Sequence, residues 1–216
     1  MRFRLTYNGP LKVTKHDGDG PMHTNKRAEH QHSIRREFHK QLKEYWRLNR
    51  FLSEHKMDPK ASKDILPPIA AGALWAADPT TRRPMADVLA DLYRRGDYRF
   101  VPLVREEISL SCSLRVLFLR RDWPNSVLTA GDIDNRIKTL VDALKIPTVA
   151  PGKPEIGEDP FFVLLDDDRR VTHLEVETDA ALLASEDDPK DQSYARLVIT
   201  VDIRPIDVTM FNLSFA

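Results

Sequence analysis

The chain has 216 residues, of which 31% are charged, and its formal net charge at pH 7 is zero. This length can bury the core of one sizeable domain, and the zero net charge argues against a uniformly basic nucleic-acid-binding protein. The single cysteine, Cys112, excludes an internal disulfide framework. No apolar run approaches the roughly 20 residues that cross a membrane, so we expect a cytoplasmic protein without a membrane partner.

The first elements are a strand and a long helix. Phe3, Leu5 and Tyr7 alternate with polar residues, which predicts a strand. From about residue 25 to residue 54, apolar residues recur every three or four positions, which predicts a helix. The expected buried stripe of this helix comprises Ile34, Phe38, Leu42, Tyr45, Leu48 and Leu52.

A second face of the same helix carries five cations, to which we assign no interleaved acid. Such a ridge can lie along the phosphate backbone of a nucleic acid, and a solvated helix face is the alternative. The five residues are Arg36, Lys40, Lys43, Arg47 and Arg50.

Residues 53–104 form a proline-broken segment that we interpret as an insertion after the first helix. Within it, residues 85–96 predict one helix that ends at Gly96. A packing or dimer element is favoured here over an arm that recognises substrate. The segment could also dock a protein partner.

Residues 107–120 then predict a long strand, because Ile108, Leu110, Cys112 and further apolar residues alternate with serines and an arginine. The strand becomes apolar on both faces towards its end, as expected for a central strand.

The next helix carries the most informative motif, GDIDNRIKTLVDALK, residues 131–145. Ile137, Leu140, Val141 and Leu144 form one apolar stripe, and we expect the helix to begin near residue 134 or 135. In extended residues before that helix, Asp132 and Asp134 would point the same way. Lys138 follows one helical turn after Asp134, on the polar face.

A second acidic group follows a short apolar strand, residues 160–165. Asp166, Asp167 and Asp168 lie at a turn before another predicted strand, residues 171–178, and the loop 148–159 is expected to lie beside the site and contact substrate. Carboxylates from two elements are the usual ligands of Mg²⁺ or Mn²⁺, so we expect these acids to share one or two such ions.

The charge distribution agrees with a phosphodiester substrate. Residues 1–60 carry 14 Lys and Arg against 7 Asp and Glu, whereas residues 131–216 carry 9 against 18. The first part would attract a nucleic-acid backbone and the second would bind cations, although charges that merely solvate two faces would look the same.

The order Asp-x-Asp-Asn, a lysine four residues after the second acid, Asp-Ala-Leu, and a later Asp-Asp before a strand resembles the RusA-type Holliday-junction resolvases. The resemblance is specific over residues 131–171 and covers most of the chain in outline. It implies that Asp132, Asp134 and Asp168 hold the metal and that Lys138 is required for cleavage. Asn135, Asp142 and Asp167 match flanking motif positions, and Asp167 is an added candidate ligand. The long segment 53–104, Thr178 in place of a lysine, and Arg169 and Arg170 depart from the family pattern.

We therefore expect one α+β domain over residues 1–216, RusA-like, with a mixed sheet and helices on one face. The expected activity is Mg²⁺-dependent hydrolysis of phosphodiester bonds in branched DNA by a homodimer, with Arg169 and Arg170 gripping flanking phosphates. The alternatives are a non-catalytic nucleic-acid-binding protein and a partner-docking subunit that retains the fold. The sequence leaves open whether the substrate is a four-way junction, a flap, a single strand or RNA.

Overall fold

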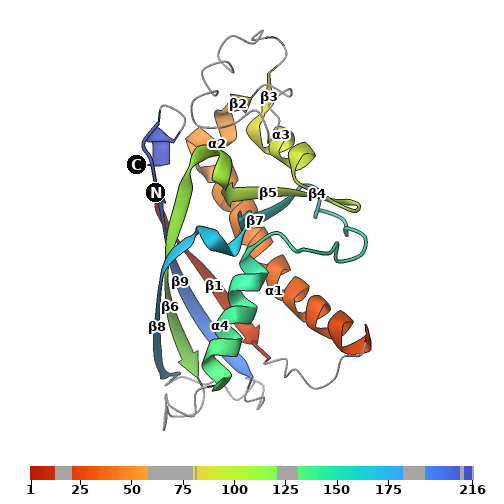
Figure 1. Ribbon diagram of the computed structural model, residues 1–216, viewed down its shortest axis with the longest axis vertical. Coiled ribbons are helices and arrows are strands. Elements are labelled where there is room, and N and C mark those ends of the chain that lie inside the picture. The colour runs from red at the N-terminus through yellow and green to blue at the C-terminus, as the bar shows by residue number, and fades with distance from the viewer. Residues whose placement is uncertain are drawn as a thin grey trace.

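A computed structural model describes residues 1–12, 21–57, 80, 82–120, 131–181, 193–209 and 212–215, without the side chains of residues 21–25 and 131–132. Its helices and strands are mixed along the chain (Figure 1). In chain order they are β1 (Arg2–Pro10), α1 (Pro21–Leu48), α2 (Arg50–Glu54), β2 (Lys56–Met57), β3 (Arg83–Pro84), α3 (Met85–Leu92), β4 (Arg94–Arg95), β5 (Tyr98–Val104), the 3-10 helix η4 (Glu106–Ile108), β6 (Leu110–Arg120), α4 (Gly131–Leu144), β7 (Phe161–Leu165), the 3-10 helix η5 (Asp168–Arg170), β8 (Val171–Ala180), β9 (Tyr194–Pro205) and the 3-10 helix η6 (Leu213–Phe215).

The largest sheet has four strands in the order β1-β9-β6-β8. β9 pairs antiparallel with both β1 and β6, whereas β8 pairs parallel with β6. Parallel neighbours need a crossover connection, and here α4 and β7 lie between β6 and β8 in the chain. The crossover therefore brings the motif helix and the acidic turn to the β8 edge of this sheet.

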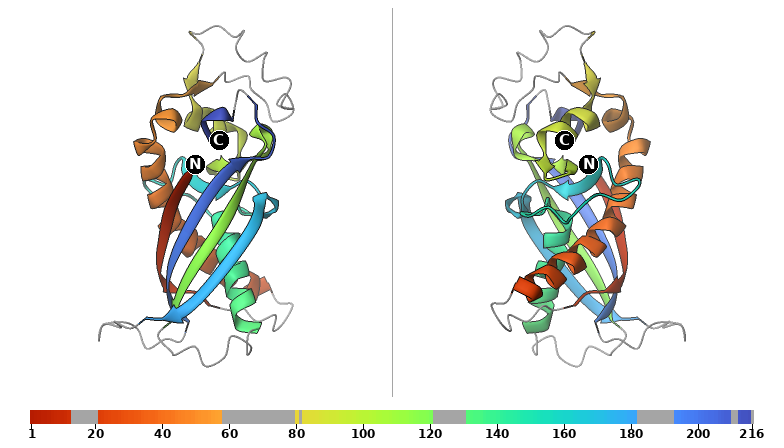
Figure 2. Two further views of the ribbon diagram at one scale, coloured as in Figure 1. Left: turned by 90° about the vertical axis from the view of Figure 1, so that its left-hand side faces the viewer. Right: turned by 90° about the vertical axis from the view of Figure 1, so that its right-hand side faces the viewer.

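Helices α1 and α4 cover one face of the four-stranded sheet. In the left view of Figure 2 the sheet faces the viewer and both helices lie behind it. The strand residues confirm this arrangement, because Leu197, Ile199, Val201 and Ile203 of β9 are buried while the residues between them are partly exposed. The α+β fold with a mixed sheet and helices on one face is thus confirmed.

A second sheet, β4-β5-β7, includes part of the segment that we interpreted as an insertion. β5 pairs parallel with β7, and Tyr98, Phe100 and Val101 are fully buried. Phe161 of β7 packs against Tyr98 and Phe100, with ring centroids 5.7 Å apart in both pairs. Residues 98–104 therefore belong to the core that supports the β7 end and its acidic turn.

Several predicted boundaries differ from those observed. Helix α3 ends at Leu92 because the chain turns at Gly96, whose φ is +57°, and enters the β4–β5 pairing. The strand predicted from residue 107 begins at Leu110, after η4. Leu48, which we placed in the buried stripe, is 67% exposed since α1 ends there and Asn49 caps α2.

Within the described residues, no helix is both long and apolar enough to cross a membrane.

Candidate functional site

A pocket of about 700 Å³ lies between α4 and β8 and contains most of the predicted motif residues. Its charged lining residues are Asp134, Lys138 and Asp142 from α4 and Asp168 from η5. Leu174, Val176 and Thr178 from alternate positions of β8 form the opposite wall, and Ile133, Ile137 and Val141 add apolar lining from α4. The fold thus brings the two acidic segments of the sequence to one cavity.

The helical spacing of α4 explains why three of these charges share a side. Asp134, Lys138 and Asp142 follow at steps of four, which places them along one face of a helix. Asp134 and Lys138 are exposed, and neither forms a hydrogen bond or ion pair with the described residues. Both are therefore available to an incoming ligand.

The helix begins at Gly131, earlier than predicted. Asp132 and Asp134 thus belong to the helix itself, and the extended geometry in which both would point the same way is wrong. Residues two apart on a helix do not face each other, so the helix geometry does not support a shared direction for these two carboxylates. The side chain of Asp132 lies outside the described residues.

Asp168 reaches the pocket from the turn after β7. Asp167 precedes it and caps η5, with its carboxylate accepting the Arg169 N–H at 3.0 Å. Asp167 is exposed and is not among the residues that line the pocket. Of the two acids proposed here as ligands, the structure therefore places Asp168 at the cavity and gives Asp167 a capping contact.

The turn that carries Asp168 is fastened to the end of β5. Asp166 accepts the Glu106 N–H at 2.9 Å and donates its own N–H to the Val104 carbonyl at 3.0 Å. Burial raises the pKa of Asp166. Arg170, 15% exposed, contacts Glu106 at 2.8 Å and Asp166 at 3.7 Å. Arg170 is therefore part of the support of the turn, and its predicted contact with a flanking phosphate stays a prediction.

Lys145 is a site residue that the sequence interpretation missed. Its Nζ lies 2.5 Å from Asp168 Oδ2 and 3.2 Å from Asp142 Oδ1. The hydrogen bond from Lys145 lowers the pKa of Asp168. Burial lowers the pKa of Lys145, but its bonds to Asp168 and Asp142 outweigh this and raise it. The three-residue step from Asp142 to Lys145 could have indicated the first contact, whereas the contact with Asp168 depends on the tertiary fold.

Asp142 is more extensively paired than Asp134. Gln31 donates to its Oδ2 at 3.2 Å and Arg27 lies 3.5 Å from the same atom, both from α1. Its side chain is 19% exposed. Asp142 thus ties α4 to α1 as well as facing the pocket.

The donor set fits a hard divalent cation in its chemistry, because carboxylate oxygens are the ligands that Mg²⁺ and Mn²⁺ prefer. Among the described residues, no three His, Cys, Asp or Glu side chains lie close enough to hold a metal ion. The predicted set included Asp132, whose side chain is not described. Asp134 and Asp168 are the predicted ligands that reach the pocket.

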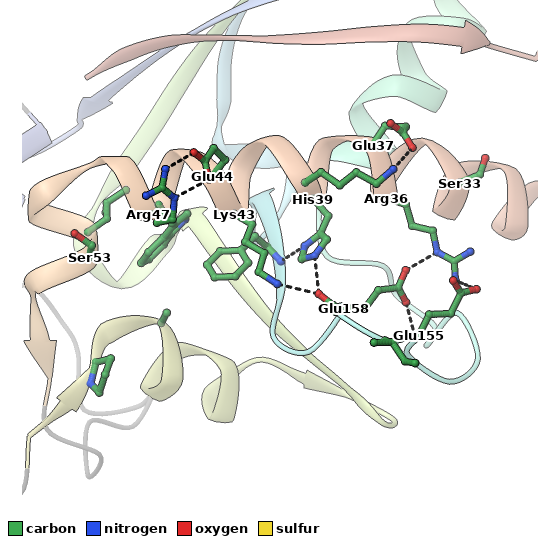
Figure 3. Close-up of a pocket in the computed structure, with 18 residues that line it drawn as sticks. Ser33, Arg36, Glu37, His39, Lys43, Glu44, Arg47, Ser53, Glu155 and Glu158 are labelled. Carbon is green, nitrogen blue, oxygen red and sulfur yellow. Dashed lines mark hydrogen bonds and ion pairs between the residues drawn. The ribbon is translucent and has the colours of Figure 1, made fainter.

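Four of the five cations of the predicted ridge, all except Arg50, line a separate groove of about 810 Å³ along α1 and the 155–158 loop (Figure 3). We expected no interleaved acid, and this is wrong. Arg36 pairs with Glu155 and Glu158, Lys40 with Glu37, Arg47 with Glu44 and Arg50 with Glu54. Lys43 donates to the neutral carbonyl of Gly157 at 3.0 Å. Glu37, Glu44 and Glu54 stand three or four residues from their partners on α1 and α2, a spacing that could have been recognised.

The loop predicted to contact substrate lies against this groove. The Gly157 carbonyl also faces His39 Nε2 at 3.3 Å, and Glu158 accepts from the Tyr98 hydroxyl at 2.9 Å. Residues 148–159 are absent from the lining of the acidic pocket. Arg169 is the flanking cation that remains exposed near that pocket, with a side chain 85% accessible.

Comparison of the chain with protein-family models, with curated proteins and with solved structures found no match.

Proposed function

We propose that the protein is a metal-dependent endonuclease that hydrolyses phosphodiester bonds in branched DNA, similar to the RusA-type Holliday-junction resolvases. The observation that supports this is the shared pocket of Asp134, Lys138 and Asp168. These residues come from two distant segments, and each carries a role that the resemblance implies. A capped helix and an acidic turn with purely structural roles would not need to line the same cavity.

In this proposal Asp134 and Asp168, the predicted ligands that line the pocket, hold the cation. The bound Mg²⁺ would lower the pKa of a water molecule and neutralise charge on the scissile phosphate. Lys138 lies one helical turn from Asp134, so its ammonium can approach the same phosphate and stabilise the negative charge of the transition state. Leu174 and Val176 form an apolar wall of the cavity beside these charged groups.

The DNA backbone would approach the pocket past Arg169 and the exposed part of α1. Among the described residues, Lys43 donates to a neutral carbonyl and not to a glutamate. It is therefore the ridge cation that most readily contacts a phosphate. The internally paired Arg36, Lys40, Arg47 and Arg50 would have to exchange glutamates for phosphates, so their net contribution to binding is expected to be small.

The resemblance also implies a homodimer, because a resolvase cuts two strands symmetrically. Light scattering after size-exclusion chromatography tests this directly. If a monomer nevertheless cleaves, the proposal that two strands of a junction are cut symmetrically is refuted, and nicking of single strands remains as the activity.

A cleavage panel tests the activity itself. Four-way junctions, flaps, single-stranded DNA and RNA are incubated with Mg²⁺, with Mn²⁺ and with EDTA. We expect cleavage of branched DNA that requires the metal and is lost in Asp134→Asn. Binding of branched DNA without cleavage in any metal would favour the non-catalytic nucleic-acid-binding protein instead.

A partner-docking subunit is the other alternative, and one observation bears on it. The Lys145 ion pairs compensate Asp142 and Asp168 as in a purely structural cluster. Co-purification of a stable second chain, together with inactivity in the panel, would support this alternative. The burial of β5 in the core limits any docking arm to the rest of the segment 53–104.

A further inference from the structure

Lys145 occupies a position that bears directly on the proposed metal site. Its ammonium contacts one carboxylate from α4 and one from η5, at 3.2 Å from Asp142 and 2.5 Å from Asp168. From the sequence we expected a divalent cation to lie between acids of these two segments. The positively charged group seen between them belongs to the chain itself.

The main chain holds Lys145 firmly in this place. Its backbone forms a parallel bridge with Leu165, and the next residue, Ile146, donates its N–H to the Leu165 carbonyl at 3.1 Å. Arg35, which is 3% exposed, donates to the carbonyls of Lys145 and Asp142 at 3.1 and 2.8 Å. The end of α4 is therefore fixed beside β7, and the lysine side chain reaches Asp168 from a rigid base.

The side chain is less constrained than the backbone. It is 21% exposed, and its aliphatic stem can rotate the ammonium away from Asp168 without moving α4. Asp168 is itself 43% exposed, so water and ions can reach its carboxylate. The ion pair can open while the fold stays intact.

We propose that Lys145 is an internal counter-ion that competes with the divalent metal for Asp168. The inference rests on the proposed metal site. In the metal-free protein the ammonium neutralises Asp168 and keeps the acidic turn in place. A metal ion that binds Asp168 must displace this ammonium or tolerate its repulsion, so Lys145 weakens metal binding while it stabilises the empty site.

The test is metal binding by Lys145→Met, measured as Mn²⁺ titration calorimetry of the full chain without nucleic acid. Removing one positive charge near a dication should tighten Mn²⁺ binding by on the order of tenfold or more, since the repulsion corresponds to about that factor even in water. Lys145→Arg keeps the charge and should show no tightening. Lys153→Met removes the charge of an exposed lysine outside the pocket, and it should leave the affinity unchanged.

Two further measurements locate the effect. Adding Asp168→Asn to Lys145→Met should abolish the gain in affinity, because the contested ligand is then missing. Thermal unfolding without metal should show Lys145→Met to be less stable than the wild type, and Mn²⁺ should raise its midpoint more than that of the wild type. A merely structural lysine would lower stability without any gain in affinity.

An unchanged or weaker Mn²⁺ affinity in Lys145→Met would overturn the inference, even if the wild type cleaves DNA with Mg²⁺. Tighter binding in Lys145→Met beside a wild type that cleaves nothing would refute the nuclease proposal and leave the counter-ion role standing. Absence of Mn²⁺ binding in both proteins would reject the two together.

Discussion

Replacing Lys138 with alanine is expected to slow Mg²⁺-dependent cleavage by on the order of a hundredfold. Lys138 is exposed in the pocket and forms no ion pair with the described residues, so its charge is free for a phosphate. Two unit charges about 4 Å apart interact by roughly 1 kcal/mol in water and roughly 4 kcal/mol near a protein surface. An intermediate value of about 2.7 kcal/mol corresponds to the hundredfold effect, which agrees with the loss of other preorganised donors.

The assay is single-turnover cleavage of a labelled four-way junction at saturating Mg²⁺, with Mn²⁺ affinity measured in parallel. Lys153→Ala is the matched control, because Lys153 is an exposed lysine outside the pocket, and it should cleave at the wild-type rate. Stability should change by less than about 0.5 kcal/mol in both variants, as for other exposed positions. A slowing of Lys138→Ala below about threefold would refute the transition-state role, and a large change in Mn²⁺ affinity would make Lys138 part of the metal site.

Asp134→Asn and Asp168→Asn should each abolish Mg²⁺-dependent cleavage while fluorescence anisotropy finds DNA affinity within about threefold of the wild type; full activity in either variant would remove it from the site. Lys43→Glu with Arg47→Glu should weaken DNA binding and flatten the plot of log affinity against log salt by up to about 2, and an unchanged slope would assign that face to solvent. The pKa of His32 is lowered from 6.5 to about 4, chiefly by burial, so the folded protein keeps this histidine neutral. Its contribution to stability is complete above pH 6.5 and is lost as the pH falls towards 4, by about 2 kcal/mol between pH 7.5 and 4.5. In urea unfolding, His32→Asn should lose this part of the pH dependence, and an unaltered profile would contradict the assignment.

Local periodicity predicted the elements that carry the site. Ile137, Leu140 and Leu144 are buried as expected for the apolar stripe of α4, because a helix buries residues three and four apart. Leu197 and Ile199, which alternate with partly exposed residues, identified the strand β9, because successive side chains of a strand point to opposite faces of the sheet. Periodicity also placed Lys138 one turn from Asp134, and both line one pocket.

Contacts between distant segments could not be predicted in this way. Nothing local indicates that β5 pairs with β7, because parallel pairing depends on a crossover through the whole fold. The insertion predicted at 53–104 therefore hid a core strand. The contact between Lys145 and Asp168 has the same origin, since it forms only once the end of α4 lies beside β7. The error on the α1 ridge was different in kind, because Glu37 and Glu44 stand at recognisable pairing distances.

The charge balance of the pocket suggests how metal and substrate would influence each other. Three carboxylates, those of Asp134, Asp142 and Asp168, are matched within the described residues by three cations, Lys138, Lys145 and Arg27. A dication that enters this neutral cluster brings excess positive charge, which a phosphate group would offset. Binding free energies are reciprocal, so a phosphodiester that strengthens metal binding must itself bind more tightly in the presence of the metal. Such coupling would make the metal bind more tightly to the DNA-bound protein than to the free protein, because the ammonium of Lys145 can approach the phosphate once it releases Asp168.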